Sequence, residues 1–113
     1  MNFYLKIKRF FILNLISLAN DVTLTICEDH YLSINCNNGY KINVISAFYG
    51  RSDTVTCLPC IGCATNCYFD SKSKLSKYFN GLSSASLQVT NSMIGSDPCP
   101  NTYKYNVIKF ECV

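Results

Sequence analysis

The sequence predicts a small α+β domain of mostly antiparallel β-strands with one short helix, held together by disulfide bonds. Three observations support this prediction. The chain has 113 residues, which suits one domain. It contains eight cysteines, and an even number in a small chain is typical of a disulfide framework. Several short stretches alternate apolar and polar side chains, as half-buried strands do.

The first 19 residues have the pattern of a secretory signal peptide. A basic start, MNFYLKIKR, precedes the apolar run FFILNLISLA, which is too short to span a bilayer. Ser17 and Ala19 fit the small-x-small pattern of a cleavage site, so we expect residues 1–19 to be removed and the protein to be secreted. Residues 20–113 then form the mature domain. The alternative is a buried N-terminal helix.

Strands are expected early in the mature chain. Residues 22–26 alternate apolar and hydroxyl side chains, and residues 31–36 place Leu32, Ile34 and Cys36 on one face.

A turn signal follows these strands. Asn-Asn-Gly at residues 37–39 precedes a second alternating stretch, residues 40–49. Two strands joined by an Asn-Gly turn predict a β-hairpin between 31–36 and 40–49.

The best helix candidate is residues 70–79. Leu75, Tyr78 and Phe79 share one helical face, and either Asp70 or Ser71 is suited to cap the first turn.

The rest of the chain is expected to add loops and strands. Residues 50–67 form a long loop pinned by cysteines, residues 86–89 a short strand, and residues 103–113 a long strand.

The charge distribution argues against a nucleic-acid partner. The net charge is +3, but Lys6, Lys8 and Arg9 lie in the predicted signal peptide. Beyond residue 19, seven basic residues balance seven acidic ones. A surface that binds polyanions needs a clustered positive excess, so we exclude this class.

The central cysteines have the spacing of a metal site. Cys57, Cys60, Cys63 and Cys67 follow the pattern C-x2-C-x2-C-x3-C of bacterial ferredoxins, and four thiolates also suit zinc. However, Tyr68 replaces the proline that usually follows, and the other four cysteines are scattered. In an oxidising compartment thiols form disulfides, so a metal or iron–sulfur protein is kept only as a remote alternative.

An enzymatic function finds little support. His30 is the single histidine, and no serine or cysteine beside it forms a recognisable nucleophile motif. Glu28 and Asp29 are adjacent, and adjacent residues on a strand point to opposite faces, so they do not form an acid–base pair. We therefore predict a protein that binds rather than catalyses.

Two motifs resemble a known family. AFYGRSDTVTC at 47–57 and DPCPNTYKYNVIKFEC at 97–112 are similar to rhamnose- or galactose-binding lectin domains of the sea-urchin-egg-lectin type. The same module occurs in fish-egg lectins and in latrophilin ectodomains. The resemblance extends over residues 26–113, and it includes the Cys-Glu pair at 27–28. It implies a disulfide-stapled fold and sugar binding.

The resemblance also implies a disulfide pattern. Its three bridges here are Cys27–Cys57, Cys36–Cys112 and Cys67–Cys99. Both cysteines of the family's fourth bridge are absent, replaced by Phe79 and Ala85. Cys60 and Cys63 have no family counterpart; they either pair with each other or link two chains.

The family's sugar-binding residues have matches in this chain. They are Glu28, Tyr49, Asn91, Asp97 and Lys104. The carboxylates accept hydrogen bonds from sugar hydroxyls, the lysine donates to them, and Tyr49 is expected to offer an apolar wall. The segment from Asn91 to Asp97 is one residue longer than usual. Beside the site, Arg51 is interpreted as structural, pairing with a buried carboxylate, and Tyr103 and Tyr105 as core or sheet-face residues.

The resemblance implies a calcium-independent lectin with no cofactor and no metal. Its partners are rhamnose- or galactose-type glycans. The alternative is an extracellular protein-interaction or adhesion module of the same fold, which binds partner ectodomains. A single domain is monovalent, so agglutination requires an oligomer.

Overall fold

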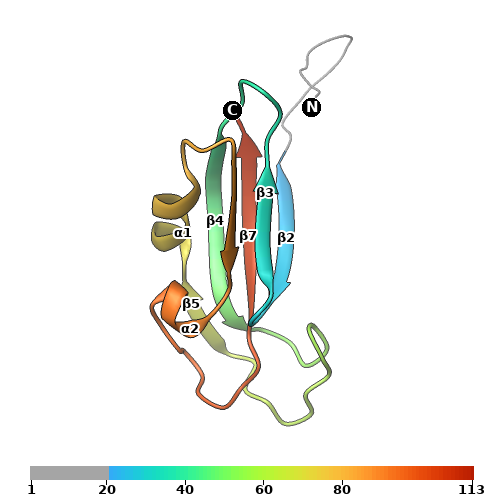
Figure 1. Cartoon of the computed structure of the whole chain (residues 1–113). Helices are drawn as coiled ribbons and strands as arrows, with labels where there is room; N and C mark the ends of the chain where they lie inside the picture. The colour runs from blue at the N-terminus through green and yellow to red at the C-terminus, as the bar shows by residue number, and fades with distance from the viewer. Residues whose placement is uncertain (1–20) are drawn as a thin grey trace.

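The computed structural model describes residues 21–113, which form two antiparallel sheets and two helices (Figure 1). The larger sheet has the order β2-β7-β4-β5, with β2 Val22–Cys27, β7 Tyr105–Cys112, β4 Ile42–Arg51 and β5 Cys67–Asp70. The smaller sheet pairs β3 Tyr31–Asn35 with β6 Ser84–Gln88, and the helices are α1 Lys72–Phe79 and α2 Asn91–Ile94. The predicted α+β class is confirmed.

Two sequence predictions concern the membrane and secretion. The predicted signal peptide, residues 1–19, lies outside the described residues. Within residues 21–113, neither helix has the length and apolar character needed to cross a bilayer.

The predicted strand faces are confirmed. Leu32 and Ile34 of β3 are buried while their neighbours along the strand are exposed. Ile108 and Phe110 are likewise buried on one face of β7. The local alternation of side chains was therefore sufficient to place these strands and to orient them.

The predicted hairpin between residues 31–36 and 40–49 is wrong. The turn itself forms, because the N–H of Tyr40 donates to the carbonyl of Asn37 at 2.9 Å and Gly39 has a φ of +88°. The two strands then separate, since β3 pairs with β6 and β4 pairs with β7 and β5. The turn therefore connects two sheets instead of two neighbouring strands.

The hydrophobic core lies between the two sheets, with α1 and α2 contributing to it. Side chains from both layers pack in one cluster: Leu32, Ile34, Leu87 and Val89 from the β3–β6 side, Ile42, Val44, Ala47, Tyr49, Ile108 and Phe110 from the larger sheet, and Leu75, Phe79 and Ile94 from the helices. Two layers around one core are the usual architecture of a small domain.

Helix α1 begins at Lys72, two residues later than predicted. Asp70 ends β5, and its Oδ1 accepts a hydrogen bond from the N–H of Lys72 at 3.0 Å. Ser71 occupies the N-cap position, but its buried hydroxyl donates to Asn106 in β7 at 2.9 Å instead of capping the helix. Of the three residues expected on one face, Leu75 and Phe79 are buried, whereas Tyr78 is 40% exposed.

Four disulfides join the described segments. Their pairs are Cys27–Cys57, Cys36–Cys112, Cys67–Cys99 and Cys60–Cys63. The first three are the pairs implied by the family resemblance, and the fourth lies within the loop that joins β4 to β5. The alternative that Cys60 and Cys63 link two chains does not describe this structure, in which they bond to each other.

The structure explains why a glycine, Gly50, stands between Tyr49 and Arg51. It lies opposite Tyr68 in the pairing of β4 with β5. A Cβ atom at this position would lie 2.1 Å from the carbonyl oxygen of Cys67. Only glycine permits the two backbones to approach so closely.

Candidate functional site

Three strand ends meet at one end of the larger sheet, toward the bottom of Figure 1. β2 ends at Cys27, which pairs with Tyr105 at the start of β7, and Tyr105 also pairs with Gly50 near the end of β4. Glu28 directly follows β2, and Lys104 directly precedes β7. The N–H of Glu28 donates to the carbonyl of Lys104 at 2.9 Å. The sheet register therefore places these two residues together.

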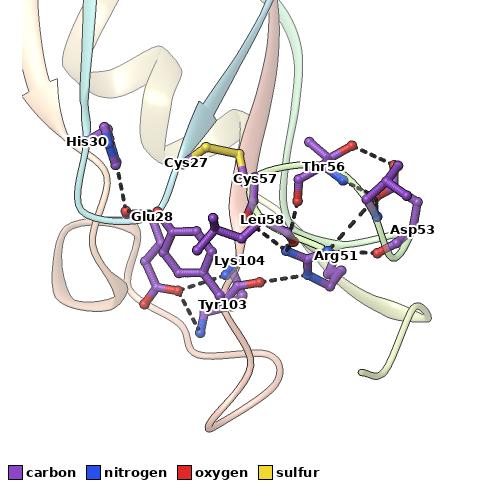
Figure 2. Close-up of a disulfide and its surroundings, with 11 residues drawn as sticks. Cys27, Glu28, His30, Arg51, Asp53, Thr56, Cys57, Leu58, Tyr103 and Lys104 are labelled. Atoms are coloured by element: carbon purple, nitrogen blue, oxygen red, sulfur yellow. Dashed lines mark hydrogen bonds and ion pairs between the residues drawn. A yellow bond between two sulfur atoms is a disulfide. The ribbon is translucent and has the colours of Figure 1, made fainter. Parts of the chain in front are cut away.

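The Lys104 ammonium group is buried among oxygen atoms. Its Nζ lies 2.9 Å from Asp97 Oδ1 and 3.3 Å from Glu28 Oε1, and it donates to the Thr102 carbonyl at 2.8 Å. Figure 2 shows the lysine beside Glu28, whose Oε1 also accepts from the N–H of Lys104 at 2.9 Å. A buried charge is tolerated when it is paired and hydrogen-bonded in this way.

The charged groups of this cluster differ in exposure. The Lys104 side chain is 2% exposed, whereas those of Glu28 and Asp97 are 15% and 33% exposed. The two carboxylate side chains are therefore partly exposed to solvent, whereas the lysine is almost completely buried. The family motifs predicted that these residues lie together, but they did not predict the exposure of each side chain.

Tyr49 is fully buried and connects this cluster to Asn91. Its hydroxyl donates to Asn91 Oδ1 at 2.6 Å, and its ring centroid lies 5.8 Å from Lys104 Nζ. Burial, and then the charges of Glu28 and Asp97, raise the pKa of the Tyr49 hydroxyl, so it stays a neutral donor. The expected exposed apolar wall is not present in this structure, because Tyr49 has no exposed surface.

Asn91 is positioned by α2, a helix the sequence did not predict. The Thr90 hydroxyl caps this helix by accepting from the N–H of Met93 at 3.1 Å, and Gly95 ends it in the left-handed conformation. The start of the segment from Asn91 to Asp97 is thus folded into a helical turn.

Arg51 stabilises the loop beside the site, and its predicted partner was wrong. The guanidinium is fully buried, and its Nε donates to the carbonyl of Tyr103 at 2.8 Å. Its other nitrogens donate to the carbonyls of Asp53, Thr56, Cys57 and Leu58, as Figure 2 shows. Arg51 does pair with a carboxylate, since Nη1 lies 4.0 Å from Asp53 Oδ1, but this side chain is 43% exposed and not buried as expected.

Tyr103 has a role that sequence reasoning missed. It is half-buried, and its hydroxyl donates to the carbonyl of Glu28 at 3.1 Å while its own carbonyl accepts from Arg51. His30 Nδ1 lies 3.2 Å from the same Glu28 carbonyl. The sequence Tyr-Lys-Tyr could have indicated this role. In an extended segment neighbouring side chains point to opposite sides, so Tyr103 is expected to point away from Lys104.

The metal-site alternative is not supported. Cys57, Cys60, Cys63 and Cys67 are all bonded in disulfides, so none of them is available as a thiolate ligand. In the part of the chain from residue 21 onward, no cluster of three histidine, cysteine or acidic side chains is placed to hold a metal ion.

Comparison with known proteins identifies the family. A family model of the D-galactoside/L-rhamnose binding SUEL lectin domain matches residues 34–112. The chain is 38% identical over 95 residues to a rhamnose-binding lectin of Silurus asotus, covering 80% of this chain and 30% of that protein. It is 34% identical over 91 residues to a D-galactoside-specific lectin of Heliocidaris crassispina, covering 77% of this chain and 86% of that protein.

A third relative is a much larger protein. Latrophilin-like protein 1 of Caenorhabditis elegans is 34% identical over 99 residues, which cover 84% of this chain and 10% of that protein. The chain thus spans a small part of this relative and less than a third of the Silurus lectin. Together with the disulfides and the Glu28–Asp97–Lys104 cluster, the family match shows that the chain belongs to the D-galactoside/L-rhamnose binding SUEL lectin domain family.

Proposed function

We propose that this chain is a secreted carbohydrate-binding domain that recognises rhamnose- or galactose-like sugars without calcium. The observation that carries the proposal is the cluster of Glu28, Asp97 and Lys104, whose carboxylate side chains are partly exposed to solvent. Sugar hydroxyls donate to carboxylate oxygens, and such charge-assisted hydrogen bonds are stronger than neutral ones. Two of the relatives are named as a rhamnose-binding and a D-galactoside-specific lectin.

Lys104 and Asn91 supply the donors in the proposed site. The contact of Lys104 Nζ with Glu28 is the longest of its three at 3.3 Å, so a hydroxyl oxygen of the sugar replaces this contact first. Asn91 Oδ1 is occupied by the Tyr49 hydroxyl, which leaves its amide nitrogen to donate. A hydroxyl in the wrong configuration leaves a charged group unpaired, so the site distinguishes epimers.

Calcium independence follows from the same residues. A calcium lectin uses the ion to bind hydroxyl oxygens, and here the Lys104 ammonium group provides the positive charge. The chain itself therefore supplies both polarities. With so few contacts, the dissociation constant for a single sugar is expected to be roughly millimolar to micromolar.

Secretion is proposed from two features. The start of the sequence has the pattern of a signal peptide, and the four disulfides suit an oxidising compartment. The proposed role is binding and not catalysis, because the only histidine, His30, lies against a backbone carbonyl and not beside a nucleophile.

A glycan array tests the proposal. The disulfide-intact protein is applied in the presence of a chelator, beside the variants Lys104→Ala and Asp97→Asn. We expect the wild type to bind rhamnose- or galactose-containing glycans and both variants to lose at least about tenfold in affinity. Asp97→Asn keeps the size of a partly exposed side chain, so it remains informative if Lys104→Ala does not fold.

The matched control is Lys109→Ala. Lys109 Nζ forms an exposed ion pair with Asp21 at 3.6 Å, away from the strand ends that form the site. This variant should bind as the wild type does. Failure of the folded wild type to bind any glycan, or binding that depends on calcium, contradicts the proposal.

An extracellular protein-interaction module is the second candidate. It is favoured by the exposed apolar side chains of Val55, Leu58 and Ile61 in one loop, and by the similarity to a latrophilin-like protein. Folded protein that binds no glycan but binds an ectodomain through this loop would support it. Substituting the three apolar residues by serine should then abolish that binding.

A further inference from the structure

The loop between β4 and β5 carries a Cys-Ile-Gly-Cys motif at residues 60–63 that the proposed sugar site does not use. Of the four disulfides within residues 21–113, Cys60–Cys63 alone joins residues close in sequence, three apart against 30, 32 and 76 for the others. Ile61 between the two cysteines is 98% exposed, and Gly62 beside it is exposed as well. The two cysteines, which are themselves half-buried, therefore flank an exposed tip of the loop.

The base of this loop is held without the Cys60–Cys63 bridge. Arg51 donates to the carbonyls of four loop residues up to Leu58. Cys57 is bonded to Cys27 at the end of β2, and Cys67 is bonded to Cys99.

The tip of the loop has weaker support. The N–H of Cys60 donates to the carbonyl of Thr54 at 2.8 Å, and that of Cys63 to the carbonyl of Cys60 at 3.4 Å. Opening the bridge therefore releases the tip without disturbing the base of the loop or the strand ends.

We propose that Cys60–Cys63 is a thiol–disulfide exchange site, at which a small monothiol opens this bridge while the other three stay closed. The external thiolate attacks one cysteine sulfur, the Cys60–Cys63 bond breaks, and the other cysteine leaves as a thiolate that takes up a proton. A second thiolate then attacks the mixed disulfide, releasing the second cysteine and an external disulfide. Two electrons pass from two external thiols to the protein, and the reverse reaction closes the bridge.

Accessibility and local freedom make this bridge the selective target. Attack requires the thiolate to reach a sulfur: Cys60 and Cys63 are half-buried beside the exposed Ile61, whereas Cys67 and Cys99 are buried. Cys27 and Cys57 are half-buried as well, but Cys27 lies in β2 and the carbonyl of Cys57 accepts from Arg51. After opening, the backbone hydrogen bonds of Cys60 and Cys63 described above remain at the tip, and the core does not fix the two thiols at bonding distance. The thiols of Cys36 and Cys112 instead stay on elements that the core holds together, so that bridge closes again.

Loss of this bridge also affects folding least. In the chain-entropy relation, the factor by which a disulfide favours the folded state grows as the three-halves power of the length of the loop that it closes. Cys60–Cys63, with a separation of 3, therefore contributes a factor about thirtyfold smaller than Cys27–Cys57, with a separation of 30. The opened protein should therefore keep its fold. The proposal is independent of sugar binding.

The test is a titration of the disulfide-intact chain with reduced and oxidised glutathione. The exchange is quenched with acid, free thiols are alkylated, and the labelled peptides are mapped by mass spectrometry. We expect Cys60 and Cys63 to be labelled or glutathionylated at a reduced-glutathione concentration at least about tenfold lower than any other cysteine. The near-ultraviolet circular dichroism should be unchanged at that point.

Two variants complete the test. The double variant Cys60→Ser/Cys63→Ser should fold with three bridges and show no labelling over the same window, and Cys63→Ser alone should carry one glutathione on Cys60. The proposal is overturned if another bridge opens first or together with Cys60–Cys63. It is equally overturned if the double variant fails to fold, because the bridge is then part of the structural framework.

Discussion

The hydroxyl of the buried Tyr49 donates a 2.6 Å hydrogen bond to Oδ1 of Asn91. This bond joins the core strand β4 to the first residue of α2. It also sets the orientation of the amide, because the oxygen of Asn91 already accepts from Tyr49 and the amide nitrogen is left as the donor. A side chain with no exposed surface can thereby determine which donor the proposed sugar site presents.

Tyr49→Phe removes this hydrogen bond and keeps the buried ring. We expect the affinity for the best sugar on the array to fall about three- to tenfold, and the free energy of unfolding to fall by about 1 kcal/mol. Calorimetric titration and urea denaturation measure the two effects. The matched control is Tyr78→Phe, which removes an exposed hydroxyl that donates to the Ser86 carbonyl. Equal affinities for the two variants would show that Tyr49 does not act through Asn91.

Stability should fall at alkaline pH because of Tyr49. Its pKa in the folded protein is raised, first by burial and then by nearby carboxylates, whereas an unfolded tyrosine ionises near pH 10. Above about pH 10 the unfolded chain therefore binds fewer protons than the folded one, and the contribution that is fully present below this pH is progressively lost. The slope from this residue is at most about 1.4 kcal/mol per pH unit.

Urea denaturation between pH 8 and pH 11 checks this dependence. The Tyr49→Phe variant provides the comparison, since it lacks the titrating hydroxyl and should lose stability less steeply above pH 10. Parallel curves for the variant and the wild type would assign the alkaline loss to other groups.

Arg51→Lys should be strongly destabilising although the charge is kept. The planar guanidinium donates to several backbone carbonyls at once, with Tyr103 on one side and residues 53–58 on the other, and an ammonium group cannot reach them all. Buried carbonyls without a donor each cost about 1–3 kcal/mol, so we expect a loss of at least about 3 kcal/mol in urea denaturation. Lys77→Ala, on the exposed side of α1, should change stability by less than about 0.5 kcal/mol.

Gly50→Ala should disturb the pairing of β4 with β5. Its Cβ would lie 2.1 Å from the carbonyl oxygen of Cys67, so the strands must separate, and we expect a loss of about 2–3 kcal/mol. Gly39→Ala is the control, because a Cβ there meets no atom within 4 Å and adds only the strain of a φ of +88°, about 1 kcal/mol. Thermal unfolding compares the two, and equal losses would indicate that the close approach is not limiting.

The strands were predictable because their signal is local. The alternation that buries Leu32 and Ile34, or Ile108 and Phe110, is a property of the strand itself. The partner of each strand is not local. The Asn-Gly turn at residues 38–39 forms as expected, yet the burial of Leu32 against Leu87 places β3 with β6 in a separate layer. A turn signal fixes the change of direction but not the sheet that follows.

The candidate site divides in the same way. The family motifs gave the residue types, and the structure places Glu28 and Asp97 each in contact with Lys104. The burial of the Lys104 ammonium depends on tertiary contacts with the segment that carries Asp97 and Thr102, which no local pattern reveals. The partners of Arg51 could not be predicted because they are backbone carbonyls, which every residue has, so the amino-acid sequence does not distinguish them.

The position of β7 determines when the domain can complete its fold. This strand lies between β2 and β4, yet it follows both of them and every other described element in the sequence. During synthesis from the N-terminus, β4 can pair with β5 early, but the edges of β2 and β4 that face β7 emerge unpaired, and Cys36 emerges long before Cys112. The middle of the sheet and its longest-range disulfide can therefore close only after residue 112 has been synthesised.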